Sequence, residues 1–189
     1  IEMKPKVLLL TASYGSGHVI AAEALDEVLK KEKISTETLD IVRIGGKTET
    51  QAAAVYEFLM KRGYNIWRIF HDRIIPIKNG MLVKGIYEQF YKNKFFKQID
   101  EFSPDVIIST MDTCSLVASL YKRQHPDVKI YTVITDYVAH ALWVWKNMDG
   151  YFVGSEKIVK FLVQYGIDKE KIKLTGIPLR SQFLHKVSK

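Results

Sequence analysis

Short apolar runs alternate with helical patterns along most of this chain, and the alternation limits the folds open to it. The runs are rich in valine and isoleucine, and most are followed by apolar residues at helical spacing. Strands of parallel sheets have this composition because crossover helices cover both of their faces. The expected strands are Lys6–Leu10, Thr38–Val42, Asp105–Ser109, Lys129–Thr135, Gly150–Gly154 and Lys171–Thr175. The pattern therefore predicts an α/β domain with a parallel sheet.

Helices are expected after three of these strands. The first begins near Gly17 or His18, and the second spans Asp112–Arg123, with its N-cap at the first or second of these residues. The third spans Ser155–Tyr165, where Ser155 is a good N-cap and the glycine that follows is a good stop. The expected buried stripe of the first helix is Ala21, Leu25, Val28 and Leu29.

The basic residues are unevenly placed. The chain has 28 Lys and Arg against 21 Asp and Glu, a formal net charge of +7, and the whole excess lies between Lys61 and Lys97, among aromatic side chains. This mixture is typical of an interfacial membrane helix, of a solvated helix whose aromatic residues face the core, and of a surface that attracts single-stranded nucleic acid. The candidates for a membrane-surface role are Arg62, Trp67, Arg68, Arg73, Lys78 and Lys84.

The single cysteine, Cys114, excludes a disulfide within the chain and any metal site built from several cysteines. This cysteine usage favours an intracellular protein. No stretch approaches the roughly 20 apolar residues that span a bilayer, and the start has no signal-peptide pattern. We therefore expect a cytoplasmic location.

The stretch Tyr14-Gly15-Ser16-Gly17-His18 stands where the first strand turns into the first helix. Strand, Gly-x-Gly and helix is the arrangement that brings backbone N–H groups and a helix N-terminus toward an anion. A dinucleotide fingerprint would need glycine where Ile20 stands, although Asp40 has the place of the ribose-binding acid. No Gly-Lys-Ser/Thr occurs, which excludes a P-loop. A nucleotide-dependent enzyme is thus the weaker interpretation of this loop.

His18 is the residue of this loop that points most directly to chemistry. The positive end of the helix dipole favours the neutral imidazole, which suits a general base. Open α/β sheets also bind ligands at the carboxyl edge, where this loop lies. The alternative is a histidine that caps the turn or packs against the strand ends. Gly15, Ser16 and Gly17 could let a ligand approach the backbone closely.

A second group of polar and aromatic residues follows the strand expected at Lys129–Thr135. Asp136 and His140 lie at the same carboxyl edge, where an Asx turn and an ordinary loop position are the structural alternatives. Their spacing also fits a metal pair, but the sequence offers no third ligand, so no metal is expected. Trp143 and Trp145 suit either the core or the headgroup layer of a membrane.

Four segments in chain order resemble one known family. They are Tyr14–His18 with the alanine-rich stretch after it, Val133–Tyr137 with His140 and Trp143, Asp149–Ser155, and Lys173–Arg180. The set is similar to the opening of the monogalactosyldiacylglycerol synthase and processive diacylglycerol glucosyltransferase family. The resemblance implies a Rossmann-like three-layer domain, the N-terminal half of a GT-B glycosyltransferase. Residues 1–180 would then bind the acceptor, and 181–189 would begin the linker to a C-terminal donor-binding domain.

The resemblance also implies an activity, namely transfer of a hexose from a UDP-sugar to diacylglycerol or a glycolipid at the membrane surface. His18 would take the proton of the acceptor hydroxyl, and Asp136 would orient His18 or that hydroxyl. Tyr14, Gly15, Ser16, Gly17, His140 and Trp143 would line the acceptor and donor loop. No cofactor is implied, because the UDP-hexose is a co-substrate held mainly by the C-terminal domain.

The resemblance favours an anionic membrane surface over nucleic acid as the partner of the basic segment. We expect a peripheral association with the cell membrane on this basis. The alternative function is a non-catalytic Rossmann-like module that binds a lipid headgroup or an anionic membrane surface.

Overall fold

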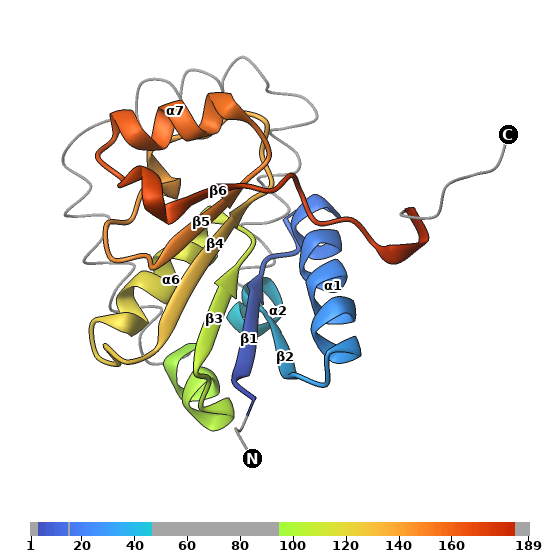
Figure 1. The fold of residues 1–189 in the computed structure, drawn as a ribbon. Coiled ribbons are helices and arrows are strands. Elements are labelled where there is room, and N and C mark those ends of the chain that lie inside the picture. The colour runs from blue at the N-terminus through green and yellow to red at the C-terminus, as the bar shows by residue number, and fades with distance from the viewer. Residues whose placement is uncertain (1–3, 15, 47–94, 184–189) are drawn as a thin grey trace, which may run out of the picture.

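The computed structural model describes residues 4–14, 16–46 and 95–183. Within these ranges, six strands form one sheet in the order β2-β1-β3-β4-β5-β6, and every neighbouring pair is parallel (Figure 1). The strands are β1 (Lys6–Thr11), β2 (Ser35–Asp40), β3 (Val106–Ser109), β4 (Lys129–Ile134), β5 (Gly150–Val153) and β6 (Ile172–Leu174). The predicted α/β class with a parallel sheet is confirmed.

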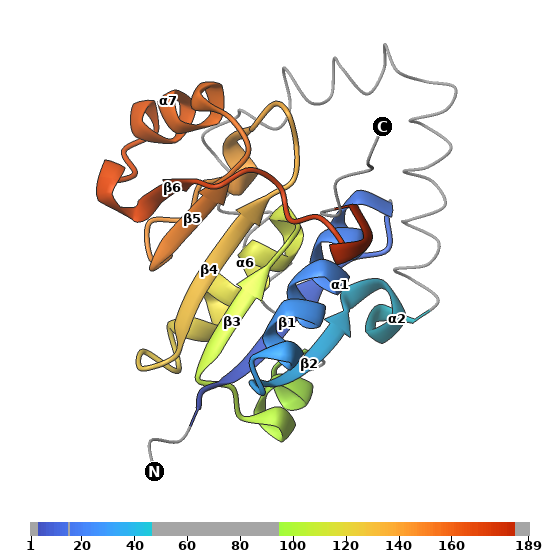
Figure 2. The same ribbon diagram turned by 45° about the vertical axis from the view of Figure 1, so that its right-hand side comes forward.

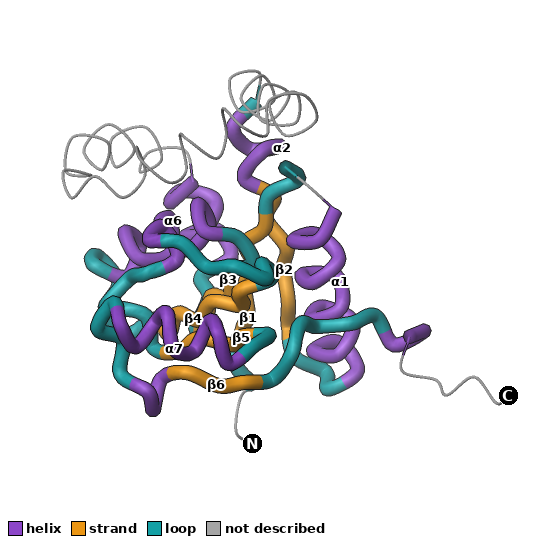
Figure 3. The backbone as a smooth tube through the Cα atoms, turned by 90° about the horizontal axis from the view of Figure 1, so that it is seen from above, coloured by secondary structure: helices purple, strands orange, loops and turns teal. Residues whose placement is uncertain are grey.

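Helices cover both faces of this sheet. Figure 2 and the view from above in Figure 3 place α1 and α6 on opposite sides of the strands, which gives three layers. The α-helices are α1 (Ser16–Lys31), α2 (Ile41–Gly45), α6 (Asp112–Lys122) and α7 (Glu156–Gln164), and residues 95–102 are also helical. The 3-10 turns are η2 (Ala141–Trp143), η3 (Lys169–Lys171) and η4 (Ser181–Phe183).

The core is built on β1, whose residues from Val7 to Thr11 are all buried. Successive residues of a strand point to opposite faces, so continuous burial means that both faces are covered. Helix α1 packs through Ala21, Ala22 and Ala24, because small side chains allow the helix to approach the strands closely. The stripe expected for this helix is therefore wrong in part, since Val28 is 52% exposed.

The second strand lies earlier in the sequence than expected. Strand β2 is at the edge of the sheet and carries mostly polar residues, so an apolar run does not mark it. The apolar pair Ile41 and Val42 belongs to α2 and is buried there. Asp40 ends the strand and caps this helix, because its Oδ1 accepts a hydrogen bond from the Val42 N–H at 3.0 Å. The strand expected at Thr38–Val42 is corrected accordingly.

The other two helices lie where they were expected. Ser155 is the N-cap residue of α7, although its side chain makes no capping hydrogen bond, and Gly166 follows the helix with a φ of +84°. The N-cap of α6 is Met111, one residue before the first of the two expected positions. Asp112 is already inside the first turn, where its carboxylate accepts a hydrogen bond from the Thr113 N–H at 2.6 Å.

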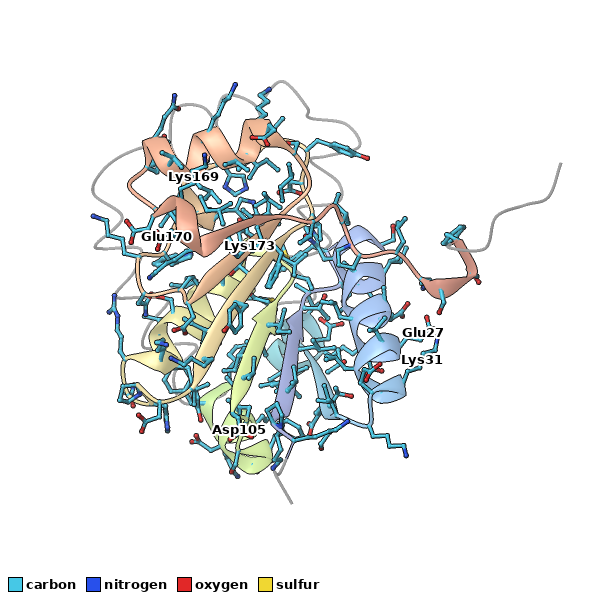
Figure 4. All side chains as sticks on the ribbon, in the orientation of Figure 1. Glu27, Lys31, Asp105, Lys169, Glu170 and Lys173 are labelled. Carbon is cyan, nitrogen blue, oxygen red and sulfur yellow. The ribbon has the colours of Figure 1, made fainter. Side chains whose placement is uncertain are left out.

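After β6, the chain returns to the exposed side of α1. Figure 4 shows Glu27 and Lys31 pointing outward from this helix, near the turn η4. The Ser181 hydroxyl donates to Glu27 and lies 3.0 Å from Lys31 Nζ, and Arg180 pairs with Glu23. Polar contacts thus join the last described residues to the first helix.

Asp149 connects β4 to α6 through a partly buried ion pair. Its carboxylate pairs with Lys122 and accepts a hydrogen bond from the Ile130 N–H at 2.8 Å, and Lys129 Nζ lies 3.5 Å away. Burial alone would raise the pKa of Asp149. The hydrogen bonds from Lys122 and Ile130 and the charges of the two lysines outweigh burial and lower this pKa below its ordinary value.

We expect the Asp149→Asn variant to be less stable than the wild type by roughly 1–2 kcal/mol at pH 7. Because the pKa of Asp149 is lower in the folded state, its contribution is complete above the unfolded pKa and is lost as the pH falls through the folded one. The difference in unfolding free energy should therefore shrink in acid. Urea unfolding at several pH values measures it. The exposed Asp127 supplies the control, and an Asp127→Asn effect of equal size would contradict the assignment.

Candidate functional site

The candidate site lies at the carboxyl ends of β1 and β3. The chain leaves β1 to form β2 on one side and later forms β3 on the other side, so the order of connection reverses between β1 and β3. Open α/β sheets bind ligands in the crevice at such a point. Helix α1 begins here, and His18 is in its first turn.

The half-buried imidazole of His18 is held by two residues that directly follow two other strands. Its Nδ1 lies 2.9 Å from the carbonyl oxygen of Thr110 and 2.7 Å from Oγ1 of Thr135. A carbonyl oxygen only accepts, so the network assigns the proton to Nδ1, which donates to it. In the neutral ring, the lone pair is then on Nε2.

The residues behind His18 are fixed by a network of buried hydroxyl groups. The Thr110 N–H donates to Leu10 O at 3.0 Å, and its hydroxyl donates to Thr11 Oγ1 at 3.0 Å. One layer further in, Ser109 Oγ lies 2.9 Å from Ser115 Oγ and 2.9 Å from Thr132 Oγ1. Because these hydroxyls connect β1, β3, β4 and α6, the ring is held by the centre of the sheet.

No role was predicted from the sequence for Thr110 or Thr135, although Thr135 lies within the motif Val133–Tyr137. The available signal was a threonine directly after each of two apolar strands that end at the edge where His18 was expected. The orienting role toward His18 that we expected of Asp136 is taken by these two threonines in the structure. The expected role of Asp136 toward an acceptor hydroxyl stays a prediction.

The loop before His18 leaves open space at Gly17. A Cβ atom added to this glycine would meet no other atom within 4 Å, and its φ is not in the left-handed region. Neither packing nor backbone conformation therefore requires glycine at this position. Ser16 is exposed at the start of α1, and Tyr14 packs at the margin of the core. Gly15 lies outside the described residues.

Asp136, His140 and Trp143 lie together in the segment after β4. The Trp143 indole N–H donates to Asp136 Oδ2 at 3.0 Å. His140 Nε2 lies 3.6 Å from Asp112 Oδ2 and 4.0 Å from Asp136 Oδ2. This imidazole is thus flanked by carboxylates from the start of α6 and from its own loop.

Trp143 is buried rather than available to a substrate. Its exposed fraction is 0%, so the predicted direct contact with the acceptor or donor is corrected, and so is a place in the headgroup layer. Trp145 is also buried, and its indole N–H donates to Leu142 O at 2.7 Å. Burial raises the pKa of Tyr151 to about 12, so its hydroxyl stays protonated and donates to Trp145 O at 2.8 Å. These buried aromatic residues fix the segment after β4 to the core of the domain.

Asp40, the candidate for a ribose-binding acid, has a structural role. Its Oδ1 accepts hydrogen bonds from the Ser13 N–H at 3.1 Å and the Val42 N–H at 3.0 Å. The carboxylate thereby connects the loop after β1 to the start of α2. This use of the side chain weakens the dinucleotide interpretation further.

The predicted membrane-surface residues Arg62, Trp67, Arg68, Arg73, Lys78 and Lys84 lie outside the described residues. Over residues 4–14, 16–46 and 95–183, no helix has both the length and the apolar character needed to cross a bilayer. In the same ranges, no group of three or more His, Cys, Asp or Glu side chains is arranged to hold a metal ion.

A six-stranded parallel sheet with helices on both faces defines a Rossmann-like α/β domain, and His18 lies at its switch point. The apo form of the lipopolysaccharide outer core galactosyltransferase WaaB has the same fold over 91% of this chain and 45% of its own, with a TM-score of 0.51 and 15% identity. The model of the monogalactosyldiacylglycerol (MGDG) synthase family matches residues 18–179. The chain belongs to this family, as its sequence motifs predicted.

Curated relatives extend the comparison. Processive diacylglycerol beta-glucosyltransferases of Bacillus mycoides (strain KBAB4) and Bacillus cereus (strain B4264) are each 29% identical to it over 188 residues. The same enzyme of Bacillus thuringiensis (strain Al Hakam) is also 29% identical. The match covers 97% of this chain and 47% of each relative, so the chain spans about half the length of the curated relatives it matches.

Proposed function

We propose that this chain is the acceptor-binding half of a membrane-peripheral glycosyltransferase that moves a hexose from a UDP-sugar to diacylglycerol or a glycolipid. The observation that carries the proposal is the imidazole of His18, held through Nδ1 at the switch point of the sheet. Membership of the MGDG synthase family and relatives named as diacylglycerol glucosyltransferases support it. The UDP-hexose would be held mainly by a C-terminal domain.

In this mechanism, His18 acts as the general base. Its Nε2 lone pair takes the proton of the acceptor hydroxyl while the hydroxyl oxygen attacks the anomeric carbon of the sugar. The bond from that carbon to the diphosphate oxygen breaks as the new glycosidic bond forms, and UDP leaves with the bonding electrons. A single direct displacement inverts the configuration at the anomeric carbon. The Thr110 carbonyl stabilises the imidazolium through the hydrogen bond at Nδ1.

The direct test uses the protein with whatever natural sequence follows this chain. It is incubated with radiolabelled UDP-glucose or UDP-galactose and diacylglycerol in vesicles, and the lipid extract is analysed for labelled glycolipid. Formation of a product with the inverted anomeric configuration supports the proposal. Vesicle binding without any transfer from either donor would instead favour the alternative, a non-catalytic module that binds a membrane surface.

We expect the Gly17→Ala variant to separate stability from activity. Alanine is preferred over glycine in a helix, and the site has room for the methyl group, so the variant should be more stable by about 0.5–1 kcal/mol. If a substrate approaches the backbone here, the same methyl group should lower kcat/KM about tenfold, a cost of the size reported for one misfitting group in a pocket. Thermal unfolding and initial rates measure the two effects. A more stable variant with an unchanged kcat/KM would show that no substrate occupies this space.

A further inference from the structure

Three apolar side chains project from the segment that follows Thr135. The exposed fractions are 85% for Tyr137, 57% for Val138 and 41% for Leu142. Their segment, residues 137–142, contains no Asp, Glu, Lys or Arg, and its only titratable groups are the Tyr137 hydroxyl and His140. We call Tyr137, Val138 and Leu142 the apolar loop. Single exposed apolar residues are common on proteins, but a group without intervening charge is typical of an interaction surface.

Hydrogen bonds from two buried tryptophans hold the apolar loop at its two ends. Asp136, directly before it, accepts a hydrogen bond from the buried Trp143 indole at 3.0 Å. At the other end, the Leu142 carbonyl accepts one from the Trp145 indole at 2.7 Å. Since both tryptophans are buried, the backbone of the loop is fixed to the core while the three side chains point away from it. The exposure is therefore built into the fold.

The loop also lies close to the proposed base. Thr135 Oγ1 is 2.7 Å from His18 Nδ1, and Tyr137 follows two residues later. Two residues span at most about 7 Å of chain. The start of the apolar loop therefore lies near the edge of the sheet where His18 is held.

We infer that the apolar loop enters the acyl-chain layer of the membrane that carries the acceptor, and so brings His18 to the depth of the acceptor hydroxyl. The inference rests on the proposed function, because a diacylglycerol presents its hydroxyl only at a lipid surface. Valine and leucine favour the hydrocarbon, and tyrosine favours the boundary between hydrocarbon and headgroups. Because the contact is apolar, it does not depend on anionic lipid and persists at high salt.

The first test uses a double variant that carries both Val138→Ser and Leu142→Ser. Its vesicle binding is compared with that of a Val28→Ser variant. Val28 is a matched control, since it is 52% exposed and lies toward the far end of α1. Binding is measured with neutral phosphatidylcholine vesicles containing diacylglycerol, in 0.5 M salt. We expect the double variant to bind at least about tenfold more weakly than the control, as for two apolar side chains withdrawn from hydrocarbon. Equal binding of the two variants, or no binding by the wild type, would overturn the inference.

Activity supplies a readout that separates lipid contact from damage to the site. With long-chain diacylglycerol in vesicles, the double variant should have an apparent KM raised about tenfold, in line with its weaker binding. With a water-soluble short-chain glycerolipid, its kcat/KM should equal that of the wild type. A parallel loss with both acceptors would assign the loop a structural role and overturn the inference. If the wild type transfers sugar to neither acceptor, the proposed function fails, and the vesicle experiment still decides the inference.

The depth of the apolar loop in the lipid bilayer is measured directly with a fluorophore attached to a cysteine thiol. Cys114 is the only cysteine in this sequence and is buried, so a Val138→Cys variant offers a new surface thiol. We expect an environment-sensitive fluorophore at position 138 to shift to the blue on vesicles and to be quenched by lipids brominated along the acyl chain. The Val28→Cys control should show neither change. A fluorophore at 138 that stays as hydrated as the control on bound vesicles would contradict insertion.

Discussion

Replacing His18 with alanine is expected to lower kcat for sugar transfer by about 10²- to 10⁴-fold, the range usual for loss of a general base. The variant removes the imidazole, whose lone pair the hydrogen bonds of the described residues place on Nε2. The KM for the acceptor should change little, because the proton moves in the transition state and contributes little to binding the ground state. Initial rates with diacylglycerol vesicles, at saturating and limiting acceptor, measure both constants.

The control for this experiment is His125→Ala. His125 stacks on Tyr121 with ring centroids 4.0 Å apart, at the end of α6 away from the carboxyl edge of the sheet. Its removal should leave kcat near the wild-type value. Both variants should keep the far-ultraviolet circular dichroism of the wild type. A folded His18→Ala protein that turns over at a near-normal rate would remove His18 from the mechanism and leave the family membership untouched.

Replacing Trp143 with alanine is expected to lower the free energy of unfolding by about 3–5 kcal/mol. The indole is completely buried and packs in the main core, so its loss leaves a cavity that the surrounding side chains fill only in part. The variant also removes the hydrogen bond to Asp136. Urea unfolding followed by circular dichroism measures the change, with the slope of the transition checked against the wild type.

A Trp143→Phe variant separates packing from the hydrogen bond. Phenylalanine restores most of the buried surface but not the indole N–H, so we expect it to recover the part of the lost stability that comes from packing. The part that remains should be about 1.5–3 kcal/mol, the usual size for one hydrogen bond to a charged group. If Trp143→Ala unfolds within 1 kcal/mol of the wild type, the side chain is not the core residue described here, and the anchoring of the apolar loop would need another explanation.

The central strands could be predicted from the sequence because burial on both faces leaves a run of apolar residues. Strand β1 is the clearest case, since it is buried from Val7 onward. Strand β2 could not be located in the same way, because an edge strand has few buried positions and its polar residues resemble a loop. The expected stripe of α1 failed for a related reason. Apolar spacing favours the larger side chains, whereas close packing placed the alanines against the sheet.

The position of His18 could be predicted because it depends on local order, a strand followed by glycines and a helix. The hydrogen-bond partners of His18 could not be predicted in this way. Thr110 and Thr135 are 92 and 117 residues away in the sequence, and only the order of the strands brings them to the imidazole. Trp143 was assigned to substrate contact because it shares a motif with Asp136, but the motif does not tell which of its side chains face inward.

Because His18 is held by residues that follow two different strands, the state of its ring reports whether the sheet is assembled. Three separate stretches of backbone must be aligned before both hydrogen bonds at Nδ1 can form. If both β3 and β4 were detached, the imidazole would be free to rotate and to exchange its proton between the two nitrogens. Nitrogen chemical shifts of this one residue would therefore report on the alignment of the central strands with the first turn of α1.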